Sequence, residues 1–272
     1  MGIWTLDDIP WSELDRSKVD PEILRTIKAA SLVEQNGADY AQYLCNVFYD
    51  DPEFQEVARR WGEEEIQHGQ ALGRWAMLVD PDFDHAKASE RFTRGFRVKL
   101  DVRDSVRGTR SGELLARCIV ETGTSSYYTA LGEATDEPVL KAICQRIAAD
   151  EFRHYKLFYS YLKRYLRREH IGLWERLRVA AGRLVESEDE ELSYAYYAAN
   201  ENAAAFDHRR YNNAYAQRVY TLYRKHHIER GMAMIFKAVG LKPNGRLNIV
   251  AARIAWAFMH LRAERLSRRH AA

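Results

Sequence analysis

Apolar side chains recur at every third or fourth position along almost the whole chain, a spacing that places them on one face of an α-helix. Prolines stand where helices are predicted to begin, at Pro21, Pro52 and Pro138, a position that suits a residue without an N–H group. No strand pattern of useful length interrupts this spacing. The predicted helices span residues 21–49, 52–78, 86–108, 112–134, 138–168 and 172–186, a long broken region at 189–239, and a last helix that ends near 268.

The composition favours the same fold class. Only 15 glycines and 6 prolines occur in 272 residues, whereas Ala, Glu, Leu and Arg are common. We therefore expect an all-α protein. Its expected organisation is an N-terminal extension at 1–20, a four-helix bundle at 21–170, and a C-terminal helical region at 171–272 packed on or beside the bundle.

Two parts of the predicted bundle repeat each other. SLVEQNGADYAQYL at 31–44 aligns with CIVETGTSSYYTAL at 118–131, an offset of 118 − 31 = 87 residues. RWGEEEIQHGQAL at 60–72 aligns with RIAADEFRHYKLF at 146–158, an offset of 146 − 60 = 86 residues. Two similar segments at nearly the same offset indicate a duplicated helix pair, related by a pseudo-twofold axis if the pairs pack together.

Each copy of the repeat carries a lone glutamate in an apolar context, followed about one helix later by Glu-x-x-His. Residues i and i+3 share one face of a helix, so the Glu and His of each motif can converge. A buried carboxylate costs several kcal/mol unless a cation pairs with it. Four inward carboxylates and two imidazoles on four helices form the ligand set of a dinuclear iron or manganese site. The predicted metal ligands are Glu34, Glu65, His68, Glu121, Glu151 and His154.

The ligand types narrow the choice of metal. Oxygen-rich sites with one imidazole per ion suit iron or manganese better than zinc or copper. We expect two iron ions, with a mixed manganese and iron pair as the open alternative. Within EEEIQHG, Glu65 is the expected ligand, while Glu63 and Glu64 face elsewhere. The remaining histidines show no comparable arrangement and are expected to have surface or structural roles.

The motifs resemble those of ferritin-like di-iron carboxylate proteins, most closely the soluble acyl-carrier-protein desaturases. EEIQHG at 64–69 is similar to their EENRHG, and DEFRH at 150–154 is similar to their DExRH; the resemblance covers about residues 25–165. It implies a ferritin-like bundle whose di-iron centre activates O₂ and oxidises an unactivated substrate. It also implies that Asp150 fixes the His68 ring, and by internal symmetry Glu64 would fix the His154 ring. Desaturases place a threonine three residues after the third-helix glutamate, and Thr124 occupies that position here.

Two roles fit Thr124. It would assist O₂ activation or deliver a proton at the metal site, or it would bond to the carbonyl four residues earlier in its own helix. Asp150 and Thr124 are the two predicted catalytic residues beside the metal ligands.

The function expected from these features is an O₂-dependent di-iron oxidoreductase, of desaturase or hydroxylase type, acting on a fatty-acyl or other lipid-like apolar substrate. The chain has no CxxC pair for a rubredoxin-like iron, so electrons would come from an external ferredoxin-like or flavoprotein donor. Open alternatives are a ferritin- or rubrerythrin-like protein that handles iron or peroxide, and a di-iron oxygenase acting on aldehydes, quinones or arylamines. The resemblance alone suggests a homodimer.

The C-terminal part of the chain is strongly basic, because residues 201–272 hold 14 Lys or Arg and 4 Asp or Glu. Such a surface would dock an acidic carrier protein, an acidic electron donor or anionic lipid heads. A helix packed on the bundle with a basic outside fits the same pattern. Nucleic acid is not expected, since no binding motif is evident. The last helix carries an apolar stripe of Leu247, Val250, Ile254, Phe258 and Leu261, and basic residues Arg253, Arg262, Arg265, Arg268 and Arg269.

Targeting signals do not alter this picture. No apolar run approaches the roughly 20 residues needed to span a membrane, and MGIWTLDDIPWSELD lacks the basic and apolar regions of a secretory signal. Cys45, Cys118 and Cys144 are an odd number without CxxC spacing, which is typical of buried free thiols in a reducing compartment. A cytoplasmic location is expected.

Overall fold

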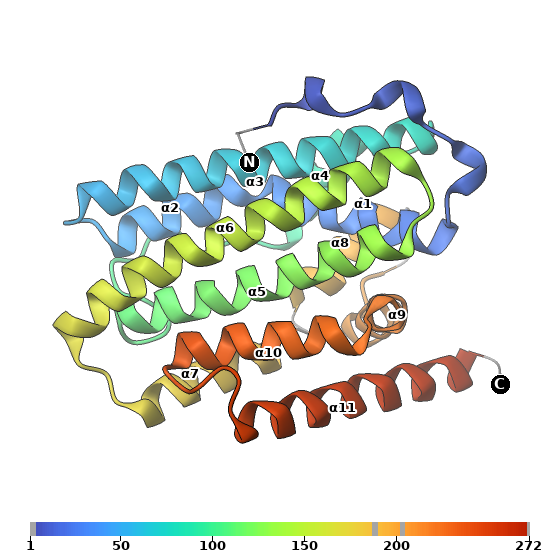
Figure 1. Cartoon of the computed structure of the whole chain (residues 1–272). Helices are drawn as coiled ribbons and strands as arrows, with labels where there is room; N and C mark the ends of the chain where they lie inside the picture. Colours follow the sequence, from blue (N-terminus) through green and yellow to red (C-terminus); the bar gives the residue numbers. More distant parts are fainter. Residues whose placement is uncertain (1–3, 187–189, 202–204, 271–272) are drawn as a thin grey trace.

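The computed structural model describes residues 4–186, 190–201 and 205–270, and no strand occurs in these ranges (Figure 1). The all-α fold class predicted from the sequence is confirmed. Three short 3₁₀ turns come first: η1 (Leu6–Asp8), η2 (Trp11–Glu13) and η3 (Arg16–Lys18). The α-helices are α1 (Pro21–Gln35), α2 (Gly37–Val47), α3 (Pro52–Val79), α4 (His85–Gly95), α5 (Arg110–Ala134), α6 (Pro138–Glu169), α7 (Leu173–Val185), α8 (Glu190–Asn200), α9 (His208–Leu222), α10 (Lys225–Val239) and α11 (Arg246–His270).

Side-chain caps fix the starts of the long central helices. Asp20, Asp51 and Glu137 each precede a proline and accept hydrogen bonds from backbone N–H groups of the first turn of α1, α3 and α6. Thr109 accepts the equivalent bond at α5. Each cap satisfies N–H groups that have no partner within the helix. These fixed starts set the level along each helix at which the acidic and histidine residues lie.

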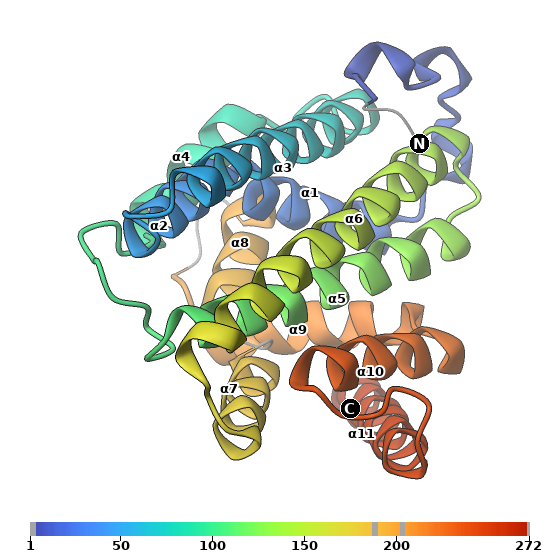
Figure 2. The ribbon, with the colours of Figure 1, turned by 60° about the vertical axis from the view of Figure 1, so that its left-hand side comes forward.

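Two groups of long helices form the centre of the molecule (Figures 1 and 2). α1 and α2 lie along α3, α5 lies along α6, and α3 meets α6. Their apolar faces build two hydrophobic clusters, one containing Trp75 and Tyr128 and the other containing Phe54 and Phe158. On both α3 and α6 the Glu-x-x-His motif falls between the stretches that enter these two clusters. Apolar layers therefore enclose the polar motifs from both ends.

The helix expected at 21–49 is divided at Asn36, which separates α1 from α2. The division accompanies a very close approach of α2 to α3. A Cβ atom added to Gly37 would lie 2.4 Å from Glu65 Cβ, and one added to Gly62 would lie 2.6 Å from Ala41 Cβ. Small residues are required wherever two helices come this close.

The helix expected at 86–108 is wrong in length, because α4 ends at Gly95 and residues 96–109 are not helical. The side chains of Val98, Leu100 and Val102 alternate in the sequence and pack against the second hydrophobic cluster. Asn46 Nδ2 donates to the carbonyl of Leu100 at 2.6 Å, which holds this strip of chain against α2. This alternation of apolar residues with period two is typical of extended chain. The prediction of one helix over 86–108 did not take it into account.

The C-terminal helices lie beside the central helices (Figure 2). α7 and α10 pack on α5, α8 packs on α1 and α4, α9 packs on α8, and α11 packs on α9 and α10. The broken helical region expected at 189–239 is seen as α8, α9 and α10. Of the two interpretations left open for the last helix, the structure favours an exposed stripe, because Leu247, Val250, Ile254, Phe258 and Leu261 are all exposed while the helix packs on α9 and α10 through other residues.

The structure also bears on the predicted free cysteines and on the predicted lack of a membrane span. Cys45, Cys118 and Cys144 are buried and form no disulfide with one another. Within the described ranges, every helix is too short or too polar to cross a lipid bilayer.

Candidate metal centre

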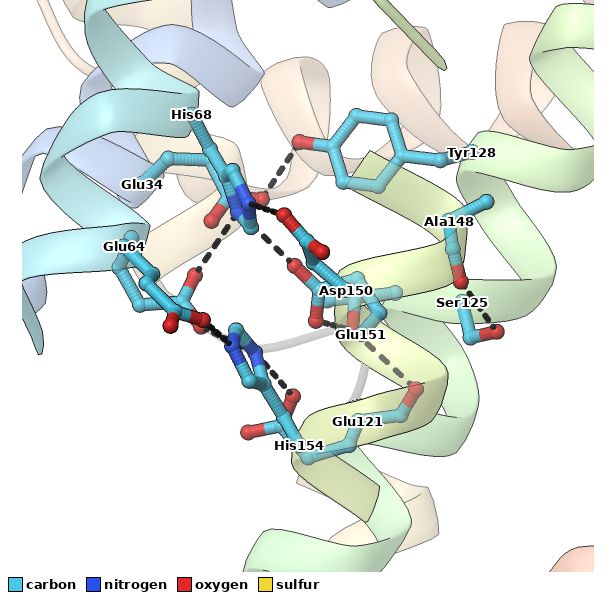
Figure 3. Close-up of polar contacts among 12 residues, drawn as sticks. Glu34, Glu64, His68, Glu121, Ser125, Tyr128, Ala148, Asp150, Glu151 and His154 are labelled. Carbon is cyan, nitrogen blue, oxygen red and sulfur yellow. Dashed lines mark hydrogen bonds and ion pairs between the residues drawn. The ribbon is translucent and has the colours of Figure 1, made fainter. Parts of the chain in front are cut away.

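The predicted ligands meet in the middle of the central helices (Figure 3). They come from α1, α3, α5 and α6, and each is at most 7% exposed. Glu34 lies in the last turn of α1, and Glu121 lies near the middle of α5. Glu65 and His68 share one face of α3, as Glu151 and His154 share one face of α6. The structure thus brings all six residues together.

Their side chains form two overlapping clusters. Ligand atoms of Glu34, Glu65, His68 and Glu151 lie within 4.8 Å of one another. The same holds for Glu65, Glu121, Glu151 and His154. Glu65 and Glu151 belong to both clusters, so each would bridge two cations. Each cation would also have one carboxylate and one imidazole of its own, the donor set of a dinuclear site in a helical bundle.

The hydrogen bonding of these atoms tests whether metal ions fit. A buried polar atom without a partner is rare in folded proteins and indicates a missing partner. In this site, six almost fully buried ligand atoms have no hydrogen-bond partner and contact other ligands only as ion pairs, with His154 Nδ1 3.0 Å from Glu65 Oε1 and His68 Nδ1 3.2 Å from Glu151 Oε1. They are Glu65 Oε1, Glu121 Oε1 and Oε2, Glu151 Oε1, His68 Nδ1 and His154 Nδ1. Cations at the cluster centres would satisfy all of them, so the residues fit two metal ions.

The outer nitrogen of each imidazole is held by a carboxylate from the other helix pair. His68 Nε2 lies 3.2 Å from Asp150 Oδ2, and His154 Nε2 lies 2.6 Å from Glu64 Oε2. Arg153 joins the two carboxylates, donating to Glu64 at 2.8 Å and to Asp150 at 2.6 Å. A carboxylate on Nε2 fixes the proton there and leaves Nδ1 free for a metal.

Trp4 in the N-terminal extension also contacts the residues that surround the two imidazoles, which are called the outer layer below. Its indole Nε1 donates to Asp150 Oδ2 at 2.6 Å, and its ring stacks on His68 with centroids 6.0 Å apart. Gln67 Nε2 donates to the Trp4 carbonyl at 3.0 Å. Burial acts to raise the pKa of Asp150, but hydrogen bonds from His68, Arg153 and Trp4 outweigh it and lower the pKa to about 2. Asp150 therefore stays anionic, as a partner of an imidazole N–H must.

Two hydroxyl groups contact the metal-facing carboxylates. Tyr128 donates to Glu34 Oε1 at 2.5 Å, and Thr124 Oγ1 donates to Glu151 Oε2 at 2.5 Å. Thr124 Oγ1 also lies 3.3 Å from the carbonyls of Val120 and Glu121. Both geometries expected for Thr124 are thus present, a contact to its own helix and a contact to the site.

In the absence of metal, burial and charge crowding control protonation. Burial raises the pKa of Glu34 and of Glu121 well above the usual range, and the charge of Glu151 acts in the same direction. Burial alone would lower the pKa of His68 and of His154, but hydrogen bonds to the surrounding carboxylates raise both pKa values well above normal. Protonation of these groups thus relieves the crowding of carboxylates that cations would otherwise relieve.

A small cavity adjoins the site on the side facing α7 and α8. Its volume is about 70 Å³, and the metal-facing carboxylates form part of its wall. Arg117, one turn before Glu121, also lines the cavity. The Arg117 side chain is 13% exposed, its guanidinium lies over the rings of Tyr40 and Trp61, and its Nε lies 3.6 Å from Glu113. A cation held between aromatic rings therefore lies beside the candidate centre.

A third cluster, Glu133 with His226 and His227, was not expected from the sequence. His227 Nδ1 accepts a hydrogen bond from the Arg224 backbone N–H at 3.0 Å, so in the neutral ring Nε2 carries the proton. That Nε2 lies 3.3 Å from Glu133 Oε2. The arrangement is that of a hydrogen-bonded cap at the start of α10, with no lone pair on His227 left for a metal.

Sequence reasoning missed some residues of the outer layer. Arg153 stands three residues after Asp150 within DEFRH, and that spacing alone would have indicated their contact. Trp4 is 146 residues from Asp150 along the chain, and no local pattern connects them. The sequence placed Tyr128 near the metal helices, but its hydrogen bond to Glu34 was not predicted.

No protein-family model matches the chain, and no curated protein matches it either. The case for its chemistry therefore rests on the geometry of the site.

Proposed function

We propose that the protein is an O₂-dependent di-iron oxidoreductase with a ferritin-like arrangement of its central helices. One observation supports this above all: Glu65 and Glu151 belong to two overlapping buried clusters, each completed by its own glutamate and histidine. Structural zinc sites hold one ion with four protein ligands, often thiolates, and do not require carboxylates shared between two ions. Oxygen-rich donors with one imidazole per ion suit iron or manganese.

The bound irons would supply O₂ binding and electron transfer, and the chain supplies the surroundings. Asp150 and Glu64 keep each imidazole proton on Nε2, so that Nδ1 faces the centre. Thr124 Oγ1 carries a proton at the wall of the cavity, 2.5 Å from Glu151 Oε2. That position is suited to proton delivery next to the centre. The apolar clusters above and below exclude water.

The cavity bears on the substrate. Pockets that enclose drug-sized ligands measure about 300–1,000 Å³, whereas this cavity of about 70 Å³ holds a few water-sized groups. It would take O₂ and the reacting end of a substrate. Arg117 at its wall favours a substrate with an anionic or polar group near that end. The fatty-acyl substrate, the external electron donor and the homodimer stay predictions.

Anaerobic loading with Fe(II), followed by exposure to O₂, tests the proposal. The expected result is two irons per chain with the Mössbauer parameters of a coupled pair, and O₂ uptake that depends on them. Glu65→Ala should abolish both, whereas Glu63→Ala, an exposed neighbour on the same helix, should change neither. One ion or none per wild-type chain contradicts the proposal. Oxidation that is faster with hydrogen peroxide than with O₂, and indifferent to every added substrate, favours peroxide or iron handling.

A further inference from the structure

The outermost helix, α11, turns its large apolar side chains to solvent. Packed helices of water-soluble proteins normally do the opposite. Contiguous exposed apolar patches of this kind mark interaction sites. The exposed side chains, with their exposed fractions, are Leu247 72%, Val250 52%, Ile254 65%, Phe258 60% and Leu261 51%.

None of these five side chains is among the buried residues of α11. Ala252, Ala263 and Leu266 are buried together with Asn248, and the helix packs on α9 and α10. Trp256 and Met259 are partly buried as well, so side chains outside the exposed stripe hold the helix against its neighbours. The outward stripe therefore contributes nothing visible to holding the helix in place.

Positive charge surrounds the stripe. Arg253, Arg265 and Arg268 are exposed on α11, and Glu264 is the only acidic residue of the helix. The wider segment 201–272 carries 14 Lys or Arg against 4 Asp or Glu. An apolar face bordered by arginines is the signature of a helix that lies in the headgroup layer of an anionic membrane.

We propose that α11 docks the protein on an anionic lipid surface. The stripe would enter the boundary between headgroups and acyl chains, and the arginines would pair with lipid phosphates. A second copy of the chain is a poorer occupant, because two antiparallel α11 helices meeting at Ile254 and Phe258 would bring two strongly basic surfaces together. An anionic lipid surface has the complementary charge.

A second helix, α7, also carries an exposed aromatic side chain. Trp174, in the first turn of α7, is 83% exposed. Figures 1 and 2 both show α7 and α11 at the lower side, opposite α3. Tryptophan prefers the interface between water and lipid. The helix that carries Trp174 thus lies on the same side of the molecule as α11.

Flotation with vesicles tests the inference on the full chain. Vesicles of phosphatidylglycerol and phosphatidylcholine should carry the protein, and vesicles of phosphatidylcholine alone should not. Ile254→Glu with Phe258→Glu should lower the partition coefficient about 100-fold or more. Arg265→Gln with Arg268→Gln should lower it roughly 20-fold. Val106→Glu is the matched control, because Val106 is 65% exposed outside α11 and its replacement should have no effect.

Circular dichroism and iron content of each variant, unchanged from wild type, would show that the fold and the centre are intact. Equal binding by the Ile254→Glu, Phe258→Glu variant and the wild type would overturn the inference, as would wild-type protein that ignores anionic vesicles. A wild-type dimer in sedimentation that this variant converts to a monomer, without vesicle binding, would instead make the stripe an interface between copies. The inference stands apart from the metal centre, since vesicle binding requires no iron.

Discussion

The indole of Trp4 and the carboxylate of Asp150 are joined by a 2.6 Å hydrogen bond across 146 residues of sequence. Asp150 in turn contacts Nε2 of His68 at 3.2 Å. The N-terminal extension thus reaches the candidate centre through one intermediate side chain. This segment supplies no predicted metal ligand, yet it is part of the support of one.

Replacing Trp4 with phenylalanine should weaken metal binding at the His68 side. The ring would still cover His68, but Asp150 would lose a donor and its pKa would rise from about 2. Loss of such an outer contact typically lowers metal affinity by 10–100-fold. Competition with a chromophoric chelator measures the change. Trp11→Phe is the control, because Trp11 Nε1 donates to the Leu6 carbonyl and not to the site. Equal losses in both variants would contradict the assigned role.

Metal stoichiometry should distinguish the shared from the unshared carboxylates. Glu34→Ala removes a ligand from one cluster only, so the metal content should fall from two ions to about one. Glu65→Ala removes a ligand from both clusters and should leave less than one ion per chain. Elemental analysis after gel filtration gives the counts. Equal stoichiometry in the two variants would mean that Glu65 does not bridge.

Replacing the metal ligand Glu121 should affect the free energy of unfolding differently in the metal-free and the iron-bound protein. Without metal, the Glu121 carboxyl is buried beside other carboxyls and lies 3.6 Å from His154 Nδ1, so Glu121→Gln, which keeps the side-chain volume and removes the charge, should leave the metal-free protein at least as stable as the wild type. With iron present, the same variant should be less stable than the wild type, because ligand binding contributes to folding. Denaturant titrations of the metal-free and the iron-bound protein measure both changes in unfolding free energy. Destabilisation of the metal-free form would show that Glu121 has a structural partner of its own.

The metal-free protein should lose stability as the pH rises. His68 and His154 have folded pKa values above the unfolded value of about 6.5, so their contribution is complete below that pH and is lost as the pH rises through the folded values. Glu34 and Glu121, whose pKa values are raised by burial, act in the same direction because the unfolded chain ionises first. Melting temperatures between about pH 6 and about pH 9 should fall for the metal-free form.

Bound metal should remove most of the pH dependence of the melting temperature, since the cations replace protons on the ligand side chains. Metal binding should therefore release protons, which calorimetry in buffers of different ionisation enthalpy detects. A pH-independent melting temperature of the metal-free form would contradict the protonation pattern described here.

Two glycines offer a contrast in packing. A Cβ at Gly37 would lie 2.4 Å from Glu65 Cβ and 3.1 Å from the Gly62 carbonyl, so Gly37→Ala should cost about 1–3 kcal/mol. It should also lower metal affinity, because Glu65 must shift. A Cβ at Gly123 meets nothing within 4 Å, so Gly123→Ala should stabilise α5 by about 0.5–1 kcal/mol. Thermal melts with and without iron compare the two, and similar effects would rule out tight packing at Gly37.

The sequence was informative where a feature has a period or a repeat. The ends of α3, α5 and α6 lie within two residues of expectation, since each begins at a cap or a proline and carries an uninterrupted helical pattern. The six predicted ligands converge because helical spacing and the duplicated pair together fix their positions. Local rules are sufficient for such features.

Features that depend on contacts between distant segments were out of reach. The division at Asn36 follows from the approach of Gly37 to Glu65, which no pattern within 21–49 encodes. The direction in which the stripe on α11 faces was left open, because a helical stripe indicates a face but not its neighbour. Trp4 reaches Asp150 only through the path of the whole N-terminal extension.

The outer contacts of the two histidines cross between the halves of the duplication. Glu64 of the first helix pair holds His154 of the second, and Asp150 of the second holds His68 of the first. Neither helix pair alone could assemble a finished site, because each supplies the outer partner of the other pair's histidine. The two halves are not equivalent in detail. Three residues after the first glutamate of each pair, Gly37 admits a neighbouring helix and Thr124 offers a hydroxyl.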